Sequence, residues 1–190
     1  MNTIGKNRMQ RESATRRLVR AALLVALSLS LFLLEGLIPL PFLAPGAKLG
    51  IANLVTLIAI LTMPARTAAL IVLTRIALAS FFGGGPTVFL YSLAGGTVSL
   101  LGMLALKKTR AFSLFAISAA GGFLHNAAQL AVGAAAASTP ALFSYLPILG
   151  PCGILTGLLL AVCASRILAR LPHALLPMGA GDRAKQKGIA

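Results

Sequence analysis

The sequence predicts an all-α integral membrane protein, built as a bundle of six transmembrane helices with both termini on the cytoplasmic side. Three observations predict this fold class. Hydrophobic residues make up 58% of the 190 residues and charged residues only 11%, against about 45–50% and about 25% in soluble domains. The chain also divides into six apolar segments separated by proline, glycine or charge. Finally, nearly all of its lysines and arginines lie outside those segments.

The first apolar segment, 18–38, follows a basic leader. We interpret it as a retained membrane helix, because no small-residue cleavage site follows it and further apolar segments do. Prolines between residues 39 and 45 end it. The second segment, 50–61, would reach about 18–24 Å at about 1.5 Å per residue, less than the roughly 30 Å hydrocarbon core. The preceding stretch, 39–48, is therefore expected to dip below the membrane surface and line a cavity.

Turn-forming residues also separate the later segments. The remaining predicted crossings are 67–82, 87–106, 112–137 and 146–168. Pro64 precedes the segment 67–82, and the glycine run and proline at 83–86 separate it from the segment 87–106. The basic run 107–110 follows that segment. Ser-Thr-Pro at 138–140 ends the fifth crossing. Clusters of these residue types are typical of helix ends and loops.

The net charge of +14 is distributed as a topology signal. With six crossings, all of the 17 lysines and arginines except Lys48 and Arg75 lie on one side of the membrane, which the positive-inside rule identifies as the cytoplasm. The basic residues do not alternate with aromatic ones, so the pattern argues against a nucleic-acid interface. We expect a membrane domain over 18–168, flanked by basic cytoplasmic tails at 1–17 and 169–190.

Polar side chains inside the predicted membrane domain form a candidate substrate-binding site. They are Glu35, Lys48, Asn53, Arg75, His125, Asn126 and Gln129. Each is expected at middle to outer depth, where a pocket open to the outside would collect them. Two interpretations stay open. In one, Glu35 pairs with Arg75 or Lys48, and the amides and imidazole satisfy each other or nearby backbone. In the other, they form a net positive cavity for an anionic or zwitterionic solute.

Catalytic and metal-binding patterns are missing from the sequence. The three acids, Glu12, Glu35 and Asp182, are far apart in the predicted topology, and there is no Walker motif. Cys152 and Cys163 are too far apart on one helix to form a disulfide. We therefore expect no enzymatic activity of this chain, no cofactor and no metal.

Several motifs together resemble one known family. They are the stretch PGAKLGIAN at 45–53, Arg75, SLAGG at 92–96, HNAAQ at 125–129 and YLPILGPCGILTG at 145–157. From about residue 19 to 167 the chain resembles the Gx transporter family, whose members are often labelled heptaprenyl diphosphate synthase component I. The resemblance implies a relative of the S components of energy-coupling factor vitamin transporters. Those have six membrane helices and bind a small solute near the outer face.

The same resemblance implies a partner. S components dock on a shared membrane subunit driven by two ATPases, through small residues spaced four apart on the first helix. Ala22 and Ala26 match that spacing here. Small residues at such positions let another helix approach closely, so we expect these two to contact either another helix of the bundle or a partner protein.

The leading functional prediction is a solute-binding or transport subunit of a bacterial inner membrane. One alternative is a noncatalytic membrane component linked to heptaprenyl diphosphate synthesis for the menaquinone side chain, because the chain lacks the aspartate-rich motif of a chain-elongating prenyl synthase. Another is a secondary transporter acting alone, with Glu35 or His125 carrying protons.

Overall fold

The computed structural model describes residues 3–38, 48–83 and 85–170, and these residues form a helical protein without strands. The elements, in chain order, are α1 (Thr3–Gly36), α2 (Asn53–Thr62), α3 (Ala65–Gly83), α4 (Gly85–Thr109), α5 (Leu114–Ala136), the 3-10 helix η1 (Pro140–Tyr145) and α6 (Leu146–Arg170). Pro64 falls between α2 and α3, as predicted. The other two predicted breaks coincide with helix ends: α3 ends at Gly83, α4 begins at Gly85, and Lys107 and Lys108 lie in the last turn of α4. The predicted dip of 39–48 lies, except for Lys48, outside the described residues.

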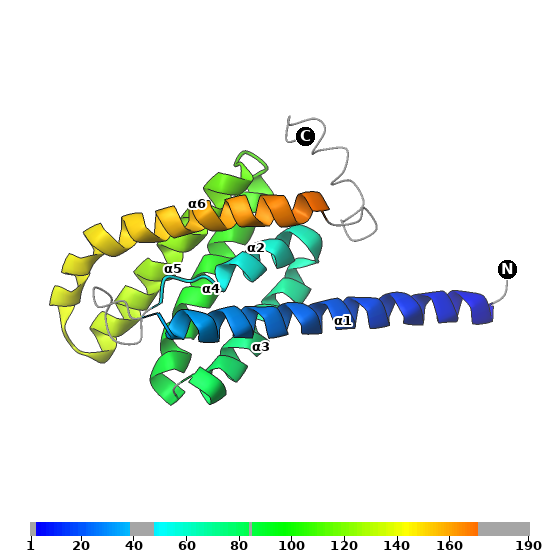
Figure 1. Cartoon of the computed structure of the whole chain (residues 1–190), viewed down its shortest axis with the longest axis horizontal. Coiled ribbons are helices and arrows are strands. Elements are labelled where there is room, and N and C mark those ends of the chain that lie inside the picture. Colours follow the sequence, from blue (N-terminus) through cyan, green and yellow to red (C-terminus); the bar gives the residue numbers. More distant parts are fainter. Residues whose placement is uncertain (1–2, 39–47, 84, 171–190) are drawn as a thin grey trace.

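Helix α1 is much longer than the predicted first crossing. It has 34 residues and begins at Thr3 rather than Leu18, so at about 1.5 Å per residue it is about 50 Å long. The reason is that ten of the 17 leader residues are Arg, Met, Lys, Gln, Glu or Ala, which are good helix formers. Figure 1 shows the N-terminal part of α1 extending away from the rest of the bundle.

The chain is a multi-pass membrane protein by the length and composition of its helices. Four stretches are long and apolar enough to cross a membrane: Ala14–Gly36, Ala65–Phe82, Gly85–Thr109 and Pro140–Arg170. Helix α5 has 23 residues but carries three buried polar side chains in its middle. Helix α2 has only 10 residues. The count of six crossings and the cytoplasmic position of both termini stay predictions.

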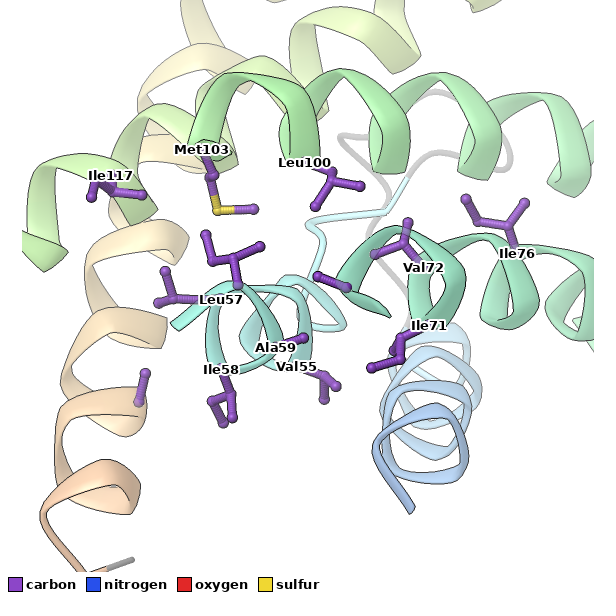
Figure 2. Close-up of a cluster of buried hydrophobic side chains, with 13 residues drawn as sticks. Val55, Leu57, Ile58, Ala59, Ile71, Val72, Ile76, Leu100, Met103 and Ile117 are labelled. Carbon is purple, nitrogen blue, oxygen red and sulfur yellow. The ribbon is translucent and has the colours of Figure 1, made fainter. Parts of the chain in front are cut away.

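Helix α2 is buried among the longer helices. Its residues Val55, Leu57, Ala59 and Ile60 have no measurable exposure, and α2 contacts α1, α3, α4, α5 and α6. Figure 2 shows Leu57 directed toward Met103 and Ile117, with side chains of α3 beside it. A helix that is apolar on every side is typical of a fully buried element, and this accounts for the short second segment.

Glycines and serines hold α4, α5 and α6 close together. A Cβ atom added to Gly153 of α6 would lie 2.5 Å from the carbonyl oxygen of Gly122 on α5. The hydroxyl of Ser118 donates to the Gly157 carbonyl at 2.6 Å, and that of Ser99 donates to the Gly121 carbonyl at 2.9 Å. Small residues that let backbones touch are the common interface material of membrane helices.

Candidate functional site

Six of the seven predicted site residues gather in one region. Glu35 comes from the end of α1, Lys48 from the segment before α2, Asn53 from the first turn of α2 and Arg75 from the middle of α3. His125 and Gln129 lie one turn apart on α5. All of them are buried except Lys48, which is half-buried. We call these six residues the polar cluster.

The carboxylate of Glu35 anchors the turn that leads into α2. One carboxylate oxygen accepts from the amide N–H of Gly50 at 2.7 Å and the other from that of Ile51 at 3.0 Å. Gly50 has a φ of 89°, a left-handed conformation that glycine adopts without strain. In the described part of the chain Glu35 forms no salt bridge to Lys48 or Arg75. The pairing of Glu35 with Arg75 or Lys48, which one of the two open interpretations contained, is therefore not formed among the described residues.

Lys48 is turned back onto α1. Its ammonium donates to the carbonyl of Phe32 at 2.8 Å and lies 3.3 Å from the centroid of the Phe32 ring. Burial lowers the pKa of the Lys48 ammonium below its usual value, and the charge of Glu35 opposes that shift. The Lys48 amide N–H donates to the side-chain oxygen of Gln129 at 2.9 Å. Lys48 thus connects α1 to α5.

His125 is enclosed by glycine backbone. Its Nε2 atom lies 2.6 Å from Nε2 of Gln129. A Cβ atom at Gly95 would come within 2.8 Å of the imidazole ring, and so would one at Gly50. Both glycines therefore belong to the surroundings of the polar cluster, and neither is among the predicted site residues. The signal for them was present, because Gly50 and Gly95 lie in two of the motifs that carried the family resemblance.

Arg75 and Asn53 are buried without matching partners. Arg75 is 2% exposed and Asn53 is 5% exposed. Among the described residues, Nε and Nη2 of Arg75 and both polar atoms of the Asn53 amide have no hydrogen-bond partner. The guanidinium carbon of Arg75 lies 5.7 Å from the Phe32 ring centroid. Phe32, which no polar pattern identifies, thus lies close to both cations of the cluster.

Asn126 belongs to a different interface. Its side-chain N–H donates to the Leu149 carbonyl of α6 at 2.8 Å, and its Nδ2 atom would contact a Cβ added to Gly153. The hydrogen bond ties α5 to α6. The structure therefore separates Asn126 from the six residues of the polar cluster.

Ala22 and Ala26 lie on an open groove between α1 and α3. Both are exposed, and the groove has a volume of about 800 Å³. It is lined by Ala14, Arg17, Leu18, Ala21, Ala22, Val25, Ala26, Leu29, Thr67, Leu70, Ile71, Thr74 and Leu78. The two alanines are accessible to a partner. The α3 residues that line the opposite side of the groove were not among the predicted contact residues.

Nothing in the described ranges brings three or more His, Cys, Asp or Glu side chains together as metal ligands would be. The polar cluster contains two cations, one anion, two amides and one imidazole.

The family comparison agrees with the motifs. Residues 24–167 match the family described as heptaprenyl diphosphate synthase component I. No curated protein and no solved structure matches the chain. The matched range covers well over half of the 190 residues and contains every residue of the polar cluster. The chain therefore belongs to the heptaprenyl diphosphate synthase component I family.

Proposed function

We propose that this protein is the solute-binding membrane subunit of a transport system, similar to an energy-coupling factor S component, in a bacterial inner membrane. In this proposal the polar cluster binds a small anionic or zwitterionic solute that enters from the outer face. The groove beside Ala22 and Ala26 receives the membrane subunit that is coupled to the ATPases. The chain itself is not a catalyst.

One observation carries the proposal: Arg75 is buried with two guanidinium nitrogens unpaired within the described residues. A buried unsatisfied polar group costs about 1–3 kcal/mol, and a charged group costs more. Binding a solute with acceptor atoms would recover that free energy. Ionisable residues inside membrane helices mark substrate pathways in many transporters, and Asn53 offers a second open group in the same region.

Ligand binding by the purified full chain tests the proposal. In detergent, thermal unfolding followed by helical circular dichroism is measured with a panel of vitamins, flavins and prenyl or quinone precursors. A binding solute is expected to raise the midpoint. The Arg75→Gln variant should lose this response, whereas Arg66→Gln should keep it, because Arg66 is exposed at the start of α3. If a binding solute raises the unfolding midpoint of both variants equally, the assignment of the site is refuted.

A second function is favoured by the family description itself, which names a component of a synthase. In this alternative the chain is a noncatalytic membrane partner of a soluble prenyl synthase. It predicts copurification with that enzyme, a rise in its product output and a fall in menaquinone when the gene is deleted. Normal quinone levels together with lost solute uptake would exclude it.

Reconstitution separates the partnered transporter from one that acts alone. If the purified chain in vesicles takes up solute without any other protein, and an uncoupler abolishes the uptake, then it is a secondary transporter. If uptake requires an energy-coupling subunit and ATP, the S-component proposal is supported.

A further inference from the structure

The hydrogen bonds of the polar cluster determine which donors and acceptors stay available to a ligand, and the orientation of Gln129 is the first of them. The backbone N–H of Lys48 can only donate, and it points at the Gln129 side chain at 2.9 Å. The atom that receives it must be the carbonyl oxygen. The orientation of the Gln129 amide is therefore determined by the backbone, and its NH₂ group faces His125.

The orientation of Gln129 determines the tautomer of His125. The Gln129 NH₂ group is a donor, and it lies 2.6 Å from His125 Nε2. That ring nitrogen must therefore accept, so the imidazole proton is on Nδ1. His125 is consequently a donor at its one remaining position, which lies against Gly95 of α4. It has no lone pair left for a ligand cation.

The other side-chain oxygens of the cluster, apart from that of Asn53, each accept a hydrogen bond from a main-chain N–H. Both oxygens of Glu35 receive main-chain N–H groups, and the Gln129 oxygen receives the Lys48 N–H. Asn53 Oδ1 is then the one side-chain oxygen of the described cluster that accepts no hydrogen bond. The donors without a hydrogen bond there are more numerous: Nε and Nη2 of Arg75, Nδ2 of Asn53 and Nδ1 of His125, the last of which is packed against Gly95. Lys48 adds a second positive charge.

From this inventory we infer that the site selects an oxyanion, a carboxylate or a phosphate group, held by Arg75 and assisted by Asn53, in preference to an amine. The inference rests on the proposed binding function and narrows it. An ammonium group has three donors and no acceptor, so it cannot bind to the open donors of Arg75 and Asn53, and it would lie beside two cations. An oxyanion matches the planar donor pair of a guanidinium. Gln129 and His125 are positioning residues in this scheme.

Simple ions test the charge preference without knowledge of the natural solute. The full chain in detergent is titrated with sodium phosphate, sodium acetate and methylammonium chloride, each against sodium chloride at equal ionic strength. Unfolding midpoints are followed by circular dichroism. We expect phosphate or acetate to raise the midpoint saturably, and methylammonium to have no effect. Comparison of the two anions shows which oxyanion is preferred.

Variants separate site binding from the general stabilising effect of phosphate on folded proteins. Arg75→Lys keeps the charge but loses the paired donors, so the half-saturating anion concentration should rise about tenfold or more. Asn53→Ala should raise it less. The exposed-site control Arg66→Gln should behave as the wild type. Because Arg75→Lys is the milder replacement, it serves where Arg75→Gln fails to fold.

Two outcomes would overturn the inference. One is a midpoint shift with methylammonium that disappears in Glu35→Gln. The other is an anion response unchanged in Arg75→Lys and Asn53→Ala. If an organic cation from the solute panel binds through Arg75 and Asn53, the transport proposal survives and the oxyanion inference fails. If neither ions nor solutes bind, both fail.

Discussion

The α5–α6 and α1–α3 contacts both contain small residues spaced four apart. They differ in whether the neighbouring helix fills the space beside those small residues. On α6, a Cβ added to Gly153 would lie 2.5 Å from the Gly122 carbonyl oxygen, and one on Gly157 would meet the backbone of Ser118. On α1, Ala22 and Ala26 are exposed along the groove. Equal spacing thus marks a closed backbone contact in one place and an open surface in the other.

A pattern of small residues therefore indicates that two helices can approach closely, and does not show that they do. In α5–α6 both helices contribute glycine, and interhelical hydrogen bonds from Ser118 and Asn126 accompany the contact. Across the groove α3 contributes Thr67, Leu70 and Thr74, which leave space beside the alanines. The groove is therefore available to something outside the chain.

The strongest test of this comparison is Gly153→Leu. We expect a large loss of stability, because the new side chain would meet backbone that cannot move aside, and overpacking costs about 1–3 kcal/mol or more. The measurement is the unfolding midpoint and the yield of monodisperse protein in detergent. An unchanged midpoint would mean that the two helices are not in contact.

An intermediate effect is expected for Ser118→Ala. Removing the hydroxyl leaves the Gly157 carbonyl without its 2.6 Å donor from α5, and interhelical hydrogen bonds in membranes contribute about 0.6 kcal/mol on average. Ser30→Ala is the matched control, since the Ser30 hydroxyl bonds only to the Ala26 carbonyl of its own helix. Equal midpoints for the two variants would contradict an interhelical role for Ser118.

The smallest effect on stability is expected for Ala26→Leu. The added side chain would point into the groove, so the free energy of unfolding should change by no more than about 0.5 kcal/mol. Capture of the proposed energy-coupling subunit, measured by copurification, should fall strongly. A midpoint drop as large as that of Gly153→Leu would show that the groove is closed in solution.

Helix breaks were predictable because proline, glycine and charge interrupt apolar runs. The last five helices begin and end within a few residues of the predicted segments. The start of α2 at Asn53 instead of Gly50 was not predictable, because Glu35, 15 residues earlier in the chain, holds the turn at Gly50 and Ile51. The early start of α1 at Thr3 was not predicted, because hydropathy locates the apolar segment and does not measure the helix propensity of the charged leader.

The polar cluster was predictable as a set of residues, and its pairing was not. Depth in each helix depends only on counting residues, so Glu35, Arg75 and His125 could be placed at similar levels. Partner choice depends on backbone geometry, such as the positive φ of Gly50, which turns two N–H groups toward Glu35. Consecutive side chains of a helix point about 100° apart, so Asn126 bonds to α6 although it is the direct neighbour of His125.

Phe32 offers an optical readout of the site. The chain contains no tryptophan and two tyrosines, so a Phe32→Trp variant would carry a single indole, in a ring position beside both Lys48 and Arg75. Indole is the ring that interacts best with cations. Its emission would therefore respond when either charge moves or becomes neutralised, and a titration could be followed in real time without labelling.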